Sequence, residues 1–259
     1  RKAIANAGLN FWTKGQSGEM VVDGFFHEQR IAIGGIGELR GNGQFVRMNA
    51  LEECGGWNEQ TITDDLDLTI RLHLNNWDID FLAFPAVAEE GVTSPIALWH
   101  QRSRWAEGGY QRYLDYWKLI LYNRMKFSKS WDLWQFLVTQ YLLSVAAVPD
   151  FLMSIILRRL PITSPLTVFT VMVSLLGMFI GLRRTRERQM SLVKEEKVME
   201  FGSRKKYPLS LLQTLLESIL GTFYMLHWFV VMGITIARMS VLPKRLKWVK
   251  TVHTGDGKS

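Results

Sequence analysis

Cysteine is almost absent from this chain of 259 residues. Cys54 is the only one, so the chain forms no disulfide within itself, and we expect Cys54 to be a small core residue. One cysteine and five histidines give no zinc-type ligand pattern. Internal repeats and low-complexity stretches are also missing, so nothing indicates a repeat architecture.

Charged side chains are scarce in three long stretches of the second half of the chain, at residues 133–157, 165–182 and 209–237. Each stretch is long enough to cross a hydrocarbon layer of ~30 Å, so we predict three membrane segments. The alternative is a buried helix hairpin in a soluble protein. Residues 1–130 mix charges, glycines and short apolar runs, which predicts a folded aqueous domain.

The net charge of +7 is not accompanied by a nucleic-acid-binding motif. Nine Lys or Arg against four Glu occupy residues 183–206, which predicts a basic cytosolic loop attracted to anionic lipid headgroups. A solvated connecting helix is the plainer interpretation. We therefore expect a lipid bilayer as partner and no nucleic acid.

The tail at residues 241–259 is also basic, which conflicts with three single crossings from a cytosolic domain. We leave open that residues 209–237 form a bent or re-entrant pair. The first stretch, which contains Pro149 and Asp150, is the other candidate for an irregular path. Glu217 and His227 lie in the third stretch, where ionisable groups usually mark a lined cavity or a partner. A position near the membrane boundary is the alternative.

The aqueous half alternates between helix and strand signals. At residues 41–46 a glycine-rich turn runs into a short apolar strand. A short helix at 49–54, a helix at 65–75, a strand at 77–84 and a long helix after Ser94-Pro95 follow, and this order predicts an α/β layer architecture. On that long helix, Tyr110, Tyr113, Trp117 and Ile120 share one face, which predicts an interfacial helix. An ordinary core stripe is the alternative.

Two short constellations point to group-transfer chemistry. Thr63, Asp64 and Asp65 stand at a predicted helix N-terminus, where a carboxylate can take a proton from an alcohol, although an Asp-Asp pair is more often a helix cap. On a helix, Gln101, Arg104 and Trp105 share a face that offers an amide, a guanidinium for phosphate oxygens and a flat aromatic surface. Alone, this second group could be a packed helix with a salt bridge.

Together and in this order, ahead of membrane segments, the two elements resemble the membrane-bound family 2 glycosyltransferases. Thr63-Asp64-Asp65 is similar to the family's acidic motif, with Asp replacing Glu in the middle, and Gln101-x-x-Arg104-Trp105 matches its second motif. The likeness implies that Asp65 is the catalytic base and that Arg104 holds the diphosphate. It also implies that Gln101 and Trp105 line the acceptor site and that Gly41, Asn42, Gly43 and Gln44 form the pocket floor.

The fold implied by the resemblance is the C-terminal part of a GT-A type glycosyltransferase domain at residues 1–130, followed by a transmembrane region at 131–240. A narrower likeness, in residues 32–47 and 61–69, is to cyanobacterial members that glucosylate a membrane lipid. It implies an inverting transfer from UDP-glucose to the free hydroxyl of 1,2-diacylglycerol, in the plasma or thylakoid membrane with a cytosolic catalytic domain.

A processive polysaccharide synthase of the cellulose, hyaluronan or poly-N-acetylglucosamine type is the alternative function, and a non-catalytic membrane scaffold is a third. The chain begins at Arg1, and we expect it to be part of a longer protein and inactive alone. The family's metal-binding Asp-x-Asp motif lies outside this fragment, so a divalent metal, expected to be Mg²⁺, is bound mainly elsewhere. Asp78-Ile79-Asp80 has that spacing, but we interpret it as structural.

Overall fold

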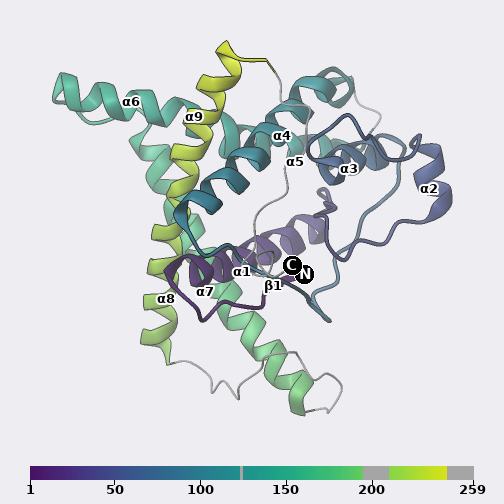
Figure 1. Cartoon of the computed structure of the whole chain (residues 1–259), viewed down its shortest axis with the longest axis horizontal. Helices are drawn as coiled ribbons and strands as arrows, with labels where there is room; N and C mark the ends of the chain where they lie inside the picture. The colour runs from purple at the N-terminus through teal and green to yellow at the C-terminus, as the bar shows by residue number, and fades with distance from the viewer. Residues whose placement is uncertain (123–124, 195–209, 244–259) are drawn as a thin grey trace, which may run out of the picture.

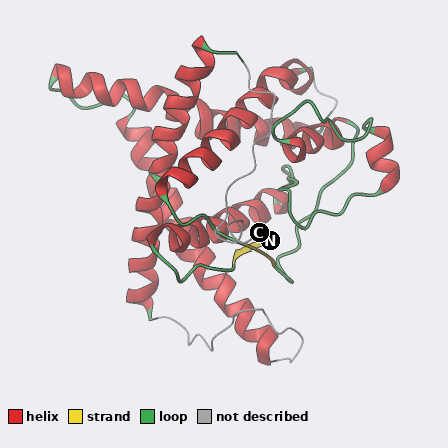
Figure 2. Cartoon of the chain, viewed as in Figure 1, coloured by secondary structure: helices red, strands yellow, loops and turns green. Residues whose placement is uncertain are grey.

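The structure is a computed structural model of the chain, and it describes residues 1–122, 125–194 and 210–243. Within that part the molecule is mostly helical, with a single two-stranded sheet (Figure 2). Strand β1 (Lys2–Ile4) pairs in parallel with β2 (Val87–Glu89), so that Lys2 lies opposite Val87 and Ile4 opposite Glu89. The expected α/β layer is thus reduced to two short strands among helices.

Four helices build the first half: α1 (Phe11–Ala32), α2 (Met48–Glu53), α3 (Asp64–Leu74) and α4 (Pro95–Leu121). Asn10 and Ser94 cap α1 and α4, each accepting a hydrogen bond from the backbone N–H three residues on. The helices predicted at 49–54, 65–75 and after Ser94-Pro95 are therefore confirmed. The periodicity of α3 and α4 and the Ser94 cap of α4 are local signals that the sequence carries directly.

The strand predicted at residues 77–84 is wrong. This segment runs between α3 and β2 without pairing in a sheet. Its alternating pattern instead reflects two separate contacts: Ile79 packs beside the core that contains Leu39 and Leu68, and the Phe81 ring lies 4.8 Å from the His27 ring. The apolar strand expected after the glycine turn at 41–43 is absent as well, because residues 44–47 lead directly into α2.

Three helical stretches in the described part of the chain are long and apolar enough to cross a membrane: Phe127–Leu157, Ser164–Ser191 and Leu211–Val241. The first comprises α5 (Phe127–Phe136), a π-helical stretch η1 (Leu137–Leu142) and α6 (Leu143–Leu157), which contains Pro149. The third is two helices, α8 (Leu211–Met225) and α9 (His227–Val241), with a break at Leu226. Both stretches that the sequence singled out therefore contain an irregularity in the helix, and their paths across a membrane stay predictions.

Helix α7 (Ser164–Lys194) extends well beyond the predicted segment 165–182. Residues 183–194 of the predicted basic loop are thus helical, as the plainer interpretation held. The rest of that loop, 195–206, lies outside the described residues, as do residues 244–259 of the basic tail. Because α7 continues without a break, its apolar and basic parts form one rigid element.

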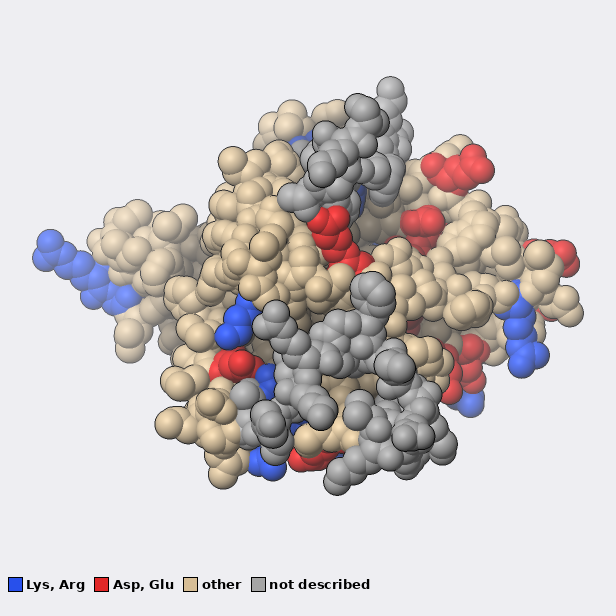
Figure 3. Space-filling model, turned by 60° about the horizontal axis from the view of Figure 1, so that its bottom comes forward, with Lys and Arg blue, Asp and Glu red and all other residues tan. Residues whose placement is uncertain are grey.

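The two halves of the chain pack closely against each other. Helix α1 lies along α7 and α8, and α4 lies along α9, whereas α6 projects to one side (Figure 1). The projection that corresponds to α6 is covered by uncharged side chains up to a basic tip (Figure 3). On α6, Phe151, Ile155 and Ile156 are exposed. A helix with such a surface is suited to a hydrocarbon environment rather than to water.

The aromatic stripe predicted for an interfacial helix is mostly core. On α4, Tyr110 and Ile120 are buried and Tyr113 packs against the same core, which fits the alternative interpretation. Trp117 is exposed, and with Leu114 and Leu121 it forms a different apolar stripe on the same helix. The exposed face is therefore rotated relative to the expected one, because the tyrosines are needed to fill the space against α5 and η1.

Candidate active site

The acidic run at the start of α3 contains three carboxylates in three different environments. Asp64 is exposed, and Asp67 is fully buried. Asp67 forms ion pairs with Arg112 and, at 2.8 Å, Arg71, and it accepts a hydrogen bond of 3.0 Å from the Tyr116 hydroxyl. It therefore fastens α3 to α4 and has no capacity left for a reacting group.

The burial of Asp65 is intermediate between that of Asp64 and that of Asp67. Asp65 is partly buried, its Oδ1 accepts the Leu66 backbone N–H at 2.9 Å, and no described cation forms an ion pair with it. Burial raises the pKa of Asp65, the Leu66 bond opposes that rise, and the Asp64 charge adds to it. A carboxylate that is ionised, unpaired and more basic than usual is what general-base catalysis requires.

The glycine-rich turn lies beside this carboxylate. Gly41 has a positive φ of 74°, and a Cβ built there would lie 3.7 Å from Asp65 Oδ2. Arg40 is partly buried, the loss of water around it lowers the pKa of its guanidinium to about 10, and the nearby Asp65 charge partly offsets this. Asn42 donates a hydrogen bond of 3.1 Å to Glu89 at the end of β2. The turn thus brings the predicted floor and the predicted base together.

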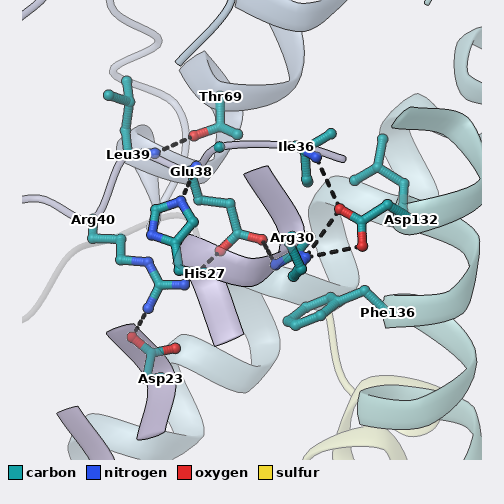
Figure 4. Close-up of polar contacts among 12 residues, drawn as sticks. Asp23, His27, Arg30, Ile36, Glu38, Leu39, Arg40, Thr69, Asp132 and Phe136 are labelled. Carbon is teal, nitrogen blue, oxygen red and sulfur yellow. Dashed lines mark hydrogen bonds and ion pairs between the residues drawn. The ribbon is translucent and has the colours of Figure 1, made fainter. Parts of the chain in front are cut away.

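The loop that carries this turn, residues 34–41, is held by buried polar contacts (Figure 4). Arg30 donates to Asp132 at 2.9 Å and to Glu38 at 2.7 Å, and Asp132 accepts the Ile36 backbone N–H at 2.9 Å. His27 Nε2 accepts the Glu38 N–H at 2.8 Å. The loop is therefore fixed at once to α1 and to α5, the start of the first apolar stretch.

Helix α4, which carries the second motif, packs against Thr63 of the first motif. A Cβ at Gly108 would lie 2.2 Å from Thr63 Cγ2, so only glycine allows Thr63, at the start of α3, to approach α4 this closely. Trp105 lies one helical turn earlier. Lys2 Nζ is 5.9 Å from the Trp105 ring centroid and 3.2 Å from Glu89, and its charge lowers the pKa of Asp65. Lys2 therefore lies within electrostatic range of the base and next to the aromatic residue.

The two other residues of the motif are Gln101 and Arg104. Gln101 is partly buried, and its side-chain oxygen has no hydrogen-bond partner among the described residues. Arg104 is also partly buried, which lowers the pKa of its guanidinium. Their roles toward a diphosphate and an acceptor stay predictions.

Sequence reasoning gave no role to Lys2, Glu19 or Arg102. Arg102 lies inside the second motif and is 1% exposed, and it forms an ion pair with buried Glu19 on α1. The position of Arg102 between Gln101 and Arg104 was an available signal. Glu19 is an isolated acidic residue on a mixed helix, and Lys2 is a lysine in a short strand, so neither carried one.

The described residues offer no site for a metal ion, since no three His, Cys, Asp or Glu side chains gather there. Asp78 pairs with Lys129, and Asp80 accepts the neighbouring Phe81 N–H at 2.7 Å. The Asp78-Ile79-Asp80 run therefore does not fit a metal in this structure.

The two ionisable residues of the third apolar stretch have partners. Glu217 pairs with Arg186 of α7 at 2.7 Å and lies 3.7 Å from Lys14 of α1. His227 Nδ1 lies 2.6 Å from the Tyr224 carbonyl oxygen, at the break between α8 and α9. Glu217 therefore has charged partners on α7 and α1.

The site thus places a basic carboxylate, a glycine turn and an aromatic motif beside membrane-type helices, the combination expected of a membrane-bound sugar transferase. Residues 3–182 match the family model "Glycosyl transferase family group 2", and the chain belongs to this family.

The relatives of the chain indicate a narrower group within this family. The chain is 61% identical over 257 residues to the β-monoglucosyldiacylglycerol synthase of Trichormus variabilis, covering 99% of this chain and 52% of that protein. It is 55% identical over 254 residues to the synthase of the same name from Synechocystis, covering 98% and 50%. A poly-β-1,6-N-acetyl-D-glucosamine synthase from Staphylococcus epidermidis is 32% identical over 120 residues, or 42% of this chain and 28% of that protein. No solved structure matches.

The chain spans about half the length of the curated relatives it matches. What the whole protein does is therefore a matter of proposal.

Proposed function

We propose that the protein containing this chain is an inverting glycosyltransferase that moves glucose from UDP-glucose to the free hydroxyl of 1,2-diacylglycerol. The observation that carries the proposal is the environment of Asp65, an unpaired and partly buried carboxylate whose pKa is raised by burial. It lies beside Gly41 and close to the α4 motif. The names of the most similar relatives supply the substrate class.

In this reaction Asp65 takes the proton of the diacylglycerol hydroxyl. The freed oxygen attacks the anomeric carbon of glucose from the face opposite UDP, the bond to the UDP oxygen breaks, and the product is a β-glucolipid. Arg104 and Lys2 are the cations that would bind the departing diphosphate. Asp65 returns the proton to water afterwards.

The remaining parts of the machinery belong to the rest of the protein. We assign residues 1–130 to the C-terminal part of a GT-A type domain, with the nucleotide half and its divalent metal contributed by chain outside these residues. The chain alone is then inactive. The catalytic half lies on the cytosolic side, because the basic residues that follow position 182 favour that side of a membrane.

The test uses the full-length protein in liposomes that contain diacylglycerol, supplied with radiolabelled UDP-glucose. We expect label in a chloroform-soluble lipid carrying a single sugar, and none with Asp65→Asn. Label found only in an ethanol-insoluble polymer would instead favour a processive synthase, the activity named for the partial Staphylococcus match. Label transfer that is unaffected by Asp65→Asn would contradict the assignment of the base.

A further inference from the structure

An ion pair between Glu19 of α1 and Arg102 of α4 is closed off from water. The two side chains are 6% and 1% exposed. Removing a pair of charges from water costs free energy that their attraction often does not recover, and apolar residues of the same size are frequently as stabilising. Stability alone is therefore a weak reason for this pair, and its other contacts indicate a further role.

Glu19 is the meeting point of three donors. Its Oε1 accepts the Trp228 indole N–H at 2.8 Å, and its Oε2 accepts from Arg102 and, at 3.3 Å, from the Tyr224 hydroxyl. Tyr224 and Trp228 lie on the two sides of the break at Leu226 between α8 and α9. One carboxylate thus holds both halves of the third apolar stretch.

A glycine on helix α1 makes room for the contact between Tyr224 and Glu19. A Cβ at Gly15 would lie 2.3 Å from the Tyr224 ring, so glycine at this position, one turn before Glu19, lets the tyrosine reach the carboxylate. The His227 ring is 4.7 Å from the Tyr224 ring and 5.5 Å from the Trp228 ring, which completes an aromatic cluster around the break.

Arg102 carries the connection to the active site. Its guanidinium carbon lies 4.1 Å from the centroid of the Trp105 ring and 5.5 Å from that of Trp228. Nε and Nη1 have no hydrogen-bond partner among the described residues. A buried guanidinium with unsatisfied N–H groups is stabilised by the π-face of an indole, and the same contact restricts the orientation of the Trp105 ring.

We propose that Arg102 and Glu19 are positioning residues. They fix the orientation of the Trp105 ring and connect it to the break between α8 and α9. The membrane-embedded helix pair then acts on the acceptor side of the site as well as anchoring the protein. This inference rests on the proposed function, because it takes Trp105 to line the acceptor site.

The test compares variants of the full-length protein in diacylglycerol liposomes. Trp228→Phe keeps an aromatic ring and removes only the indole donor. Trp131→Phe is the matched control, since Trp131 is 61% exposed on α5 and its described ring contact is to Phe127. We measure kcat and KM for the acceptor. Separately, we measure the slow hydrolysis of UDP-glucose, in which UDP is released and water takes the place of the acceptor, so that the donor site is needed but no lipid.

For Trp228→Phe we expect kcat/KM toward the acceptor to fall about tenfold, as for loss of one hydrogen bond to a charged group, with UDP release to water unchanged. Trp131→Phe should behave as wild type. A second variant, Glu19→Leu with Arg102→Met, replaces the pair by apolar groups so that folding is retained. We expect it to unfold at the wild-type temperature and to lose acceptor turnover in the same way.

Wild-type acceptor turnover in both Trp228→Phe and the double replacement would overturn the inference. Equal losses of transfer and of UDP release to water would also overturn it, because they indicate a general structural role. The identity of the wild-type product, lipid or polymer, tests the proposed function separately. The ratio of variant to wild-type kcat/KM is measured with whichever acceptor the wild-type protein uses.

Discussion

Three carboxylates stand within four positions at the start of α3, and only one has the environment of a base. Asp67 is saturated by two arginines and a tyrosine, and Asp64 is exposed to water. Asp65 alone is partly buried without an ion pair to a described cation. At the residue scale, the chemistry therefore follows from surroundings that the triplet Thr63-Asp64-Asp65 does not itself reveal.

Replacement of Asp65 by Asn should separate activity from stability. Because burial raises the folded-state pKa above the unfolded value, ionising Asp65 costs folding free energy as the pH rises through that interval. Asp65→Asn removes this cost, so thermal unfolding at pH 7 should occur at the wild-type temperature or slightly above it. Glucosyl transfer should fall by orders of magnitude.

Thermal unfolding in detergent and product formation in liposomes measure the two effects on the same preparation. Asp64→Asn is the control, because its side chain is exposed, and it should retain most activity. A large drop in unfolding temperature for Asp65→Asn would show that the carboxylate is structural.

The pH profile should report the neighbours of Asp65. The reaction needs the ionised carboxylate, so kcat/KM should fall as the pH drops through the raised pKa, at a higher pH than for an ordinary Asp at about 3.9. The positive charge of Lys2 lowers that pKa. Lys2→Gln should therefore move the acid limb to still higher pH, whereas Lys14→Gln, on an exposed lysine, should leave it in place. An acid limb that Lys2→Gln leaves unmoved would contradict this.

Among single residues, the sequence predicted a role only for those that belong to a recognisable motif. Asp65 and Trp105 could be singled out in this way, and the structure places each in the same region, next to Gly41 and Lys2 respectively. Glu19 could not be found, because its importance depends on Tyr224 and Trp228, more than 200 positions away. No local pattern encodes a partner at that separation.

At the scale of elements, the loop 34–41 depends on two neutral histidines. His27 Nε2 accepts the Glu38 N–H at 2.8 Å, and His73 Nε2 lies 2.8 Å from the Gly37 carbonyl oxygen while its Nδ1 faces Lys129 at 3.2 Å. A ring nitrogen that accepts a hydrogen bond cannot carry a proton. Burial lowers the pKa of both rings, in agreement with these contacts.

Acid should therefore destabilise the contacts that hold this loop. For a histidine whose folded-state pKa is lowered, the stability contribution is full above the unfolded pKa of about 6.5 and is lost as the pH falls toward the folded value. We expect the unfolding temperature in detergent to decline between pH 7 and pH 5. The double variant His27→Gln/His73→Gln should be less stable at pH 7 and lose less on acidification, whereas His100→Gln, on an exposed histidine, should keep the wild-type decline.

Helices were predictable and strands were not, for a physical reason. Helix α3 follows from its periodicity, the start of α4 follows from its Ser94 cap, and the three apolar stretches follow from composition. A strand requires a partner, and β1 and β2 are joined across more than 80 positions. Residues 77–84 had the alternation of a strand but no neighbour to pair with, so the pattern indicated the wrong element.

At the scale of the whole molecule, the membrane-type helices pack against the elements that carry the candidate site. Helix α1 packs on α7 and α8, and α4 packs on α9. Arg30 of α1 reaches Asp132 of α5, and Arg238 of α9 reaches buried Glu107 of α4 at 2.8 Å. The arrangement of the site therefore depends on helices whose outer faces are apolar. Composition along the sequence could indicate a membrane, but it could not show that each apolar stretch also supports the site.

The side of the membrane on which the site lies gives a last prediction. The basic residues at 183–188 follow the apolar part of α7 and favour the cytosolic side, so residues 1–122 should lie there too, since α1 packs along α7. Glu59 is exposed beside the start of α3, and Cys54, the chain's one cysteine, is buried. Glu59→Cys in the full-length protein should react with a membrane-impermeant maleimide in inverted vesicles and not in intact cells, relative to the parent protein. Reaction in intact cells would place the site on the opposite face, away from a cytosolic supply of sugar nucleotide.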